Sequence, residues 1–341
     1  MKKQSWFKYF FLLFTLLFAP ALRAQTIVPL QQGKPTSIRG LSVVDDNVAW
    51  VSGSKGYIAI TKDGGKNWDW QQVKGFEKAD FRDIEAFSDN EAIIMSSGTP
   101  ALILKTTDGG ANWKVKYQNA DTSYFFDAMD FDTPKHGIVL GDPIGAKFML
   151  METKDGGESW NLYNDRPDAQ PGEAAFAASG TCLKISKYFI GIATGGSNAR
   201  LINYNITLGS WQYDQLPIVH HKASQGAFSF ALGRDRMLLV GGDYADDKKA
   251  DSVAAYAKTR LDATQMYTQI KTGPGGFQSC VEYIKDNIFL STGTPGSNIT
   301  TDGGKTWVKI NDTSYNVCRK AKHGKLVLLA GNGGKIGVLK M

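Results

Sequence analysis

The feature that most restricts the fold is an eight-residue text, T-x-D-G-G-x-[NST]-W, which occurs four times. The copies occupy residues 61–68, 106–113, 153–160 and 300–307. Consecutive Asp-Gly-Gly residues favour a tight turn, because glycine adopts positive φ without steric cost and the carboxylate accepts bonds from nearby backbone N–H groups. The closing tryptophan suits the start of a strand. We therefore interpret the four boxes as hairpin corners of one repeated unit.

The spacing of the boxes predicts seven units. Their aspartates follow one another at 63, 108 and 155, steps of 45 and 47, and the step from 155 to 302 is 147, three times 49. Two degenerate boxes are expected in that gap. The candidates are residues 208–211 and 263–267, which keep an aromatic residue but lack the aspartate. A period in the forties with strand-like text is typical of β-propellers.

Each unit contains text for four strands. The first strands start near residues 37, 80, 124, 175, 227, 277 and 316, and the second strands cover 49–51, 92–95, 137–140, 190–193, 237–240, 288–290 and 326–329. A third strand leads into each box, and a fourth follows it. The last unit stops after its third strand, so residues 26–30 can supply its outer strand. The sequence therefore predicts an all-β fold, a seven-bladed β-propeller of four-stranded antiparallel blades over residues 25–341, closed by the N-terminal strand.

The first 24 residues have the pattern of a secretory signal peptide. Two lysines precede an apolar run over residues 10–18, and Ala-Leu-Arg-Ala stands before Gln25. This order predicts cleavage after Ala24 and a periplasmic or secreted protein without a membrane span after cleavage. An uncleaved anchor is the alternative. The absence of a cysteine near residue 24 argues against a lipoprotein.

Charge and cysteine content restrict the partners and the compartment chemistry. The formal net charge is +6, and removal of four basic residues with the signal peptide leaves +2, which gives no support for nucleic-acid binding. The three cysteines are Cys182, Cys280 and Cys318. Cys280 and Cys318 can form one bridge in an oxidising compartment, but their apolar, strand-like surroundings favour buried free thiols. The sequence leaves both alternatives open, a disulfide between these two cysteines or two free thiols.

The box text resembles the Asp-box, or bacterial neuraminidase repeat, and the chain as a whole is similar to the seven-bladed propellers related to the photosystem II stability and assembly factor. This resemblance implies the fold. It implies less about function, because sialidases, xyloglucan-active glycosidases, sorting receptors and assembly factors also carry Asp-boxes. Four equivalent carboxylates cannot serve one active site, so we expect a structural role for the box residues and packing of their tryptophans between blades. These are Asp63, Trp68, Asp108, Trp113, Asp155, Trp160, Asp302 and Trp307.

Strand alternation places all boxes on one face, the bottom, and directs the search for a binding site to the opposite, top face. The candidate binding residues there are Arg39, Arg82, Asp83, Asp127, Asp142, Arg200, Asp243, Tyr244 and Arg319. Arg39 and Arg82 occupy equivalent positions in neighbouring units. They are expected either to hold an anion or to pair with Asp83 and Asp127. We identify no catalytic set, no metal site and no cofactor motif in the sequence.

Two classes of function fit these observations. The first is an exported, non-catalytic binding or assembly module, a monomer whose partner is another protein or a glycan. The alternative is a glycosidase of the sialidase type, which in that family needs three arginines, a tyrosine nucleophile with a glutamate partner, and an acidic aspartate. Candidates for those roles are Arg39, Arg82, Arg200 and Arg319, with Tyr244 or Tyr283 beside Glu282. Sialidases usually have six blades, so a count of seven tells against this alternative.

Overall fold

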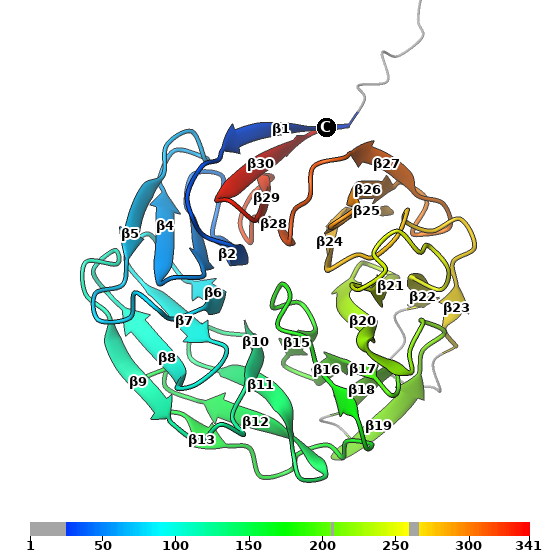
Figure 1. Cartoon of the computed structure of the whole chain (residues 1–341), viewed down its shortest axis with the longest axis horizontal. Coiled ribbons are helices and arrows are strands. Elements are labelled where there is room, and N and C mark those ends of the chain that lie inside the picture. The colour runs from blue at the N-terminus through cyan, green and yellow to red at the C-terminus, as the bar shows by residue number, and fades with distance from the viewer. Residues whose placement is uncertain (1–24, 206–207, 259–265) are drawn as a thin grey trace, which may run out of the picture.

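The computed structural model describes residues 25–205, 208–258 and 266–341, and these form a ring of seven antiparallel sheets around a central channel (Figure 1). Strands are the regular elements of the described residues. No helix in these three segments has the length and apolar character that crossing a membrane requires. The predicted seven-bladed fold is therefore confirmed. The predicted signal peptide, residues 1–24, lies outside the described residues.

Within each blade the strands follow one another from the channel outward. Blade 1 contains β2 (Ile38–Val43), β3 (Ala49–Gly53), β4 (Tyr57–Thr61) and β5 (Asp69–Gln72). Blade 2 contains β6 (Phe81–Ala86), β7 (Ala92–Ser96), β8 (Ala101–Thr106) and β9 (Lys114–Asn119). Blade 3 contains β10 (Phe126–Phe131), β11 (Gly137–Ile144), β12 (Lys147–Thr153) and β13 (Asn161–Leu162). Blades 4 and 5 contain β15 (Leu183–Ser186), β16 (Phe189–Ala193), β18 (Arg200–Asn205), β19 (Ser210–Gln215); and β20 (Lys222–Leu232), β21 (Arg236–Asp243), β22 (Ala254–Lys258), β23 (Thr268–Gln269). Blades 6 and 7 contain β24 (Cys280–Lys285), β25 (Ile288–Gly293), β26 (Gly296–Thr300), β27 (Val308–Asn311); and β28 (Val317–Lys320), β29 (Val327–Gly331), β30 (Lys335–Lys340).

The ring closes between the two ends of the described chain. β1 (Thr26–Gln31) pairs antiparallel with β30, with Ile27 opposite Leu339, and so becomes the outer strand of blade 7. Figure 1 shows the blue first strand beside the red last one. The prediction that the N-terminal strand completes the seventh blade is confirmed.

The four boxes form turns with the same hydrogen bonds. In the first box, Thr61 Oγ1 donates to Asp63 Oδ1 (2.9 Å). The Gly65 N–H donates to Thr61 Oγ1 (2.9 Å), and the Asn67 N–H donates to Asp63 Oδ1 (2.9 Å). The backbone N–H of Asn67 and, to a smaller extent, its side-chain amide donate to this carboxylate and lower the pKa of Asp63 to about 2. Gly64 and Gly65 have φ of 73° and 88°, values that favour glycine. The box carboxylates are therefore engaged in holding their own turns.

The core lies between the blades, where the faces of neighbouring sheets meet. Trp50 of blade 1 and Trp113 of the second box meet edge to face, with ring centroids 6.4 Å apart. The same cluster combines Ile58 and Ile60 of blade 1 with Phe81 of blade 2. Aromatic pairs of this geometry add about 0.5–1.5 kcal/mol beyond the area that they bury. Each blade is thus held chiefly by its two neighbours.

The expected start of the fourth blade is wrong. The first strand was placed near residues 175–177, but the innermost strand is β15, and residues 175–182 lie in the channel instead. Ahead of them, β14 (Glu173–Ala174) pairs with β17 (Gly195–Gly196), which joins the sheet of blade 5. Of the degenerate boxes, Ser210 and Trp211 begin β19, the expected fourth strand. The other lies mostly in residues 259–265, outside the described segments.

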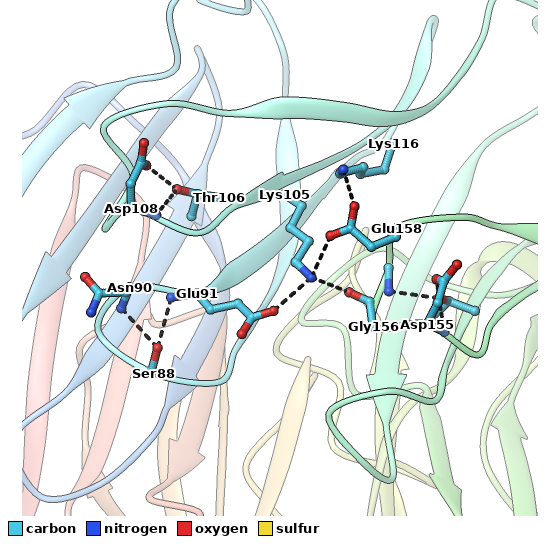
Figure 2. A network of polar contacts seen from close by, with 12 residues as sticks. Ser88, Asn90, Glu91, Lys105, Thr106, Asp108, Lys116, Asp155, Gly156 and Glu158 are labelled. Carbon is cyan, nitrogen blue, oxygen red and sulfur yellow. Dashed lines mark hydrogen bonds and ion pairs between the residues drawn. The ribbon is translucent and has the colours of Figure 1, made fainter.

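A buried lysine links blades 2 and 3 (Figure 2). Lys105 Nζ, on β8, donates to the Gly156 carbonyl of the third box (2.8 Å) and lies 2.8 and 3.0 Å from the carboxylates of Glu91 and Glu158. Lys116 adds a second ammonium at 2.5 Å from Glu158. The Lys105 side chain is 7% exposed, whereas the two carboxylates are 40% and 49% exposed.

We expect Lys105→Met to lower the free energy of unfolding by about 1–2 kcal/mol, because the methionine fills the space but leaves the Gly156 carbonyl without its donor. Urea titration of both proteins measures the change. The matched control is Lys62→Met, which removes an exposed pair with Asp89 and is expected to change stability by less than about 0.5 kcal/mol. Equal effects of the two substitutions would contradict a structural role for the buried lysine.

Candidate functional site

Residues 175–182, here called the plug, fill the central channel. Arginines from three blades bind three successive plug carbonyls. Arg82 Nη1 lies 3.5 Å from the Ala177 oxygen, Arg39 Nη1 3.4 Å from that of Ala178, and Arg319 Nη2 3.1 Å from that of Ser179. On the opposite side, hydroxyl groups of the plug bond blades 5 and 6, through Thr181 Oγ1 to Ser229 Oγ (2.6 Å) and Ser179 Oγ to the Ser279 carbonyl (2.7 Å). The plug separates two cavities.

The cavity on the top face, here called the upper funnel, has a volume of about 440 Å³. Its wall combines Arg39, Arg82 and Asp127 with five aromatic rings, Phe125, Phe176, Phe228, Tyr244 and Phe277. Phe176 and Phe228 stack at 3.7 Å between centroids, and Phe277 meets Phe228 edge to face at 4.7 Å. Tyr244 is 53% exposed at the rim. The funnel is therefore an open, partly apolar site with two arginines and a buried carboxyl on one side.

Bulges in the innermost strands bring side chains into this funnel. Arg39, Arg82, Asp127 and Phe228 each fall where the pairing of the first and second strands skips one residue. A bulge inserts an unpaired residue and re-aims its side chain. The repeat thus presents equivalent positions of four blades to one cavity.

The charges of the upper funnel are arranged differently from the predicted pairs. Arg82 Nε pairs with Asp80 at 2.8 Å, and its guanidinium lies 5.9 Å from the ring centre of Phe125. Burial, together with the nearby Arg82, lowers the pKa of Arg39. The expectation that these arginines pair with Asp83 and Asp127 is wrong, because Asp80 is closer to Arg82 and neither expected ion pair forms among the described residues.

Two buried carboxyls lie beside the plug on the side of blade 3. Asp127 is 1% exposed, and burial together with Asp142 raises its pKa well above the ordinary value. Burial also raises the pKa of Asp142 to about 6, and its Oδ1 accepts a long bond from the Ala175 N–H (3.4 Å). These groups favour the protonated form more than an exposed aspartate does.

Two further candidates lie outside the funnel. Arg200 is buried against Glu173, with Nε 2.8 Å from Oε1 and a second contact from Nη2 to Oε2. Asp243 is also buried and accepts bonds from Gln225 Nε2 (2.9 Å) and the Ala245 N–H (3.0 Å). Neither side chain lines the upper funnel, and both make contacts within the chain, so their place in a binding surface stays a prediction.

Asp83 and Arg319 line the cavity below the plug, here called the lower chamber, with a volume of about 530 Å³. Asp83 accepts bonds from the N–H groups of Ile84 (2.9 Å) and Met129 (2.8 Å), and burial raises its pKa to about 7 despite the nearby Arg319. The prediction that these two residues face the top is corrected. Both lie farther along their innermost strands than Arg39 and Arg82, and the plug covers them.

The aromatic wall is the part of the site that sequence reasoning missed. Phe228 falls at the position of its unit that Arg39 and Arg82 occupy in theirs, so the repeat alignment contained a signal for it. Phe176 belongs to the plug, for which the repeat has no counterpart. For metal binding, no group of three His, Cys, Asp or Glu side chains gathers suitably in the described parts of the chain.

Comparison with known proteins identifies the group of propellers that this chain resembles. A family model described as "Photosynthesis system II assembly factor YCF48" matches residues 26–120. A curated relative from Synechococcus sp. (strain CC9902), "Photosystem II assembly lipoprotein Ycf48", is 31% identical over 124 residues, which are 35% of this chain and 34% of that protein. Over these residues the chain is similar to Ycf48. The match spans about a third of the relative's length.

Solved structures of the Ycf48 type have the same fold over nearly the whole chain. The structure titled "YCF48 bound to D1 peptide" has a TM-score of 0.64 at 15% identity, with 93% of this chain and 97% of that one covered. YCF48 from Cyanidioschyzon merolae also has a TM-score of 0.64 at 15% identity, with 92% and 98% covered. The Pan2 WD40 domain of Neurospora crassa reaches 0.61 at 13% identity, with 89% of both chains covered. At these identities the structural likeness shows the fold alone.

Proposed function

We propose that this chain is an exported, non-catalytic assembly propeller that binds a segment of a partner protein in the upper funnel. The observation that carries the proposal is the funnel wall, where Arg39, Arg82 and Asp127 face a cluster of aromatic rings. Aromatic and arginine side chains are those that most often dominate protein interfaces. A segment with an apolar side chain and a charged or polar group suits this wall.

The likeness to Ycf48 supports a binding role. One Ycf48 structure is titled as bound to a D1 peptide, and the curated relative is named an assembly lipoprotein. Export rests on the signal-peptide pattern of residues 1–24. From these proteins we infer for this chain only the class of function, which is peptide binding during assembly.

The sialidase alternative finds less support in the geometry. Of its candidate arginines, two line the upper funnel, Arg200 is paired with Glu173, and Arg319 lies below the plug. Tyr244 is at the upper rim, whereas Glu282 lines the lower chamber. Three arginines beside a tyrosine and glutamate pair are therefore not brought together by the described side chains.

A photo-crosslinking amino acid at position 244 tests the proposed funnel. We expect it to capture a discrete partner segment in cells that produce the protein, while the same group at Val308, 63% exposed on β27, captures none. For a synthetic peptide of the captured segment, Arg39→Ala with Arg82→Ala should raise Kd at least about tenfold, a loss of roughly 1.4 kcal/mol. Lys62→Ala, which removes a cation on the box face, should leave Kd unchanged.

Equal capture at both positions, or a Kd unaffected by the two arginine substitutions, would contradict the funnel as the binding site. Incubation with fluorogenic glycosides, a sialoside included, distinguishes the alternative. We expect no release above a protein-free control. Turnover that Tyr244→Phe abolishes would replace the binding proposal with the enzymatic one.

A further inference from the structure

Cys280 and Cys318 lie side by side on β24 and β28, the innermost strands of blades 6 and 7. Their sulfur atoms are 3.7 Å apart, both side chains are fully buried, and both thiols are free. The third cysteine, Cys182, is equally buried, but its sulfur lies 3.5 Å from the Phe176 carbonyl, which is an acceptor. The chain therefore holds one thiol pair and one isolated thiol as an internal comparison.

Polar groups surround the sulfur of Cys280. Its thiol donates to the Cys318 carbonyl at 3.3 Å, and the donors to the sulfur are the Cys318 N–H at 3.4 Å, the Thr181 hydroxyl and the Cys318 thiol at 3.7 Å each, and Arg319 Nη1 at 3.9 Å. Burial alone would raise the pKa of this thiol, but the donors and the guanidinium charge outweigh burial and lower it to about 5. Burial raises the pKa values of Cys182 and Cys318. A nearby arginine favours the thiolate, and a second thiol can resolve its oxidised form, so the pair can react with an oxidant small enough to enter.

Arg319 connects this pair with the lower chamber. The guanidinium that lies 3.9 Å from Cys280 Sγ also lines that cavity, so an oxidant bound in the chamber by Arg319 would lie near the sulfur. The two sulfurs are otherwise enclosed by the plug residue Thr181 and by the innermost strands. Because both side chains are fully buried, a small oxidant is favoured over protein thiols and disulfides as the reactant.

We propose that Cys280 and Cys318 form a peroxide-reactive pair that closes to a disulfide between blades 6 and 7. The Cys280 thiolate attacks one oxygen of a hydroperoxide, the O–O bond breaks, and Cys280 becomes a sulfenic acid while the leaving oxygen takes up a proton. The Cys318 thiol then attacks the Cys280 sulfur, the S–O bond breaks, and water leaves with the thiol proton. The two sulfurs are oxidised by two electrons and the peroxide is reduced by two.

Closure of the pair changes the charge around the plug. The negative charge that Cys280 presents to Arg319 disappears, while Arg319 keeps its contact with the Ser179 carbonyl of the plug. The covalent link also joins the blade next to the ring closure to its neighbour. The disulfide is therefore expected to raise Tm, because it restricts the unfolded chain.

Treatment of the full, reduced protein with hydrogen peroxide tests this proposal. After quenching, alkylation under denaturing conditions and peptide mass spectrometry report each cysteine. We expect Cys280 and Cys318 to lose their thiols together, with a mass loss of about 2 Da, while Cys182 stays reduced. The rate should be half-maximal well below pH 8.5, the region of an ordinary cysteine. Cys182→Ser should react like the wild type.

Variants separate the two roles. Cys318→Ser should accumulate a sulfenic acid at Cys280 that dimedone traps, whereas Cys280→Ser should leave Cys318 reduced. Arg319→Gln should slow the reaction at pH 6 at least about tenfold and move its pH midpoint upward. Oxidation of Cys182 as fast as the pair, retention of both thiols until the protein unfolds, or loss of the Cys318 thiol in Cys280→Ser would each overturn the proposal.

Discussion

Replacing Arg200 by methionine is expected to lower the free energy of unfolding by about 3–5 kcal/mol, the largest effect of any single substitution proposed for this chain. The effect is large because the substitution leaves the carboxylate of Glu173 buried without its cation. Glu173 is fully buried, with a side chain 0% exposed, and Arg200 supplies its counter-charge. Thr194 Oγ1 (2.6 Å) and the Gln170 N–H (2.9 Å) also donate to this carboxylate, but they are neutral. Guanidinium chloride titration followed by tryptophan fluorescence measures the loss.

A double-mutant cycle identifies the cause of that loss. Glu173→Gln in the Arg200→Met background should recover much of the stability, because the neutral amide still accepts from Thr194 and no charge stays buried. Lys147→Met is the matched control, since it removes a cation from an exposed pair with Asp168 in the same region and should cost less than about 1 kcal/mol. If the double variant were as unstable as the sum of the singles, lost packing rather than an unpaired charge would be the cause.

The ring itself was predictable because its information is local. Each box specifies a turn through residues within four positions of one another, such as Thr61, Asp63 and Gly65. Four such turns at a regular spacing determine the strand direction and the blade count, and the outer strand from the N-terminus follows from the unit that lacks one. Arg39 and Arg82 line one cavity, because equivalent residues of a repeat lie at equivalent heights around the channel.

The plug was not predictable in the same way. Residues 175–178 are alanine and phenylalanine, a composition that suits a strand start, and nothing local tells that they pack in the channel. The partners of the candidate charges also depend on tertiary structure. Arg200 meets Glu173, 27 positions earlier, and Arg319 meets Ser179, 140 positions earlier. The sequence therefore indicated candidate charged residues but could not say which of them pair with distant parts of the chain, and it did not indicate the phenylalanines of the wall.

Several carboxyl groups of the blades are buried around the plug, and their protonation affects the stability of the fold. Asp83 and Asp127 adjoin it, and Glu282 lies in the chamber below. Burial raises the pKa of each of these groups, and that of Asp83 to about 7. The box aspartates behave in the opposite way, since hydrogen bonds lower the pKa values of Asp63 and Asp155 to about 2.

We therefore expect the protein to lose stability as the pH rises from about 4 to about 8. Between those values the buried carboxyls bind protons that the aspartates of the unfolded chain, with pKa values near 3.9, have lost. Cys280, whose pKa is lowered, acts in the opposite direction, but it is one group against Asp83, Asp127, Asp142 and Glu282, so the free energy of unfolding falls with pH. For Asp83 the shift of about three pKa units corresponds to on the order of 4 kcal/mol. Below pH 4 the box carboxylates become protonated and stability falls again. Urea titrations at intervals from pH 2.5 to 8.5 should give a maximum near pH 4–5.

The variant that isolates this effect is Asp83→Asn, because an amide cannot ionise but still offers one oxygen to the N–H groups of Ile84 and Met129. This variant is expected to be less stable at every pH, because it loses one acceptor oxygen. The quantity to compare is therefore the slope of the free energy of unfolding against pH, which should be markedly smaller than that of the wild type between pH 5 and 8. Asp89→Asn, at an exposed pair with Lys62, should keep the wild-type slope. A wild-type stability that rises up to pH 7, or a slope that Asp83→Asn leaves unchanged, would mean that water or relaxation of the plug solvates these carboxyls in the folded protein. In that case the channel would be more open at neutral pH than its contacts indicate.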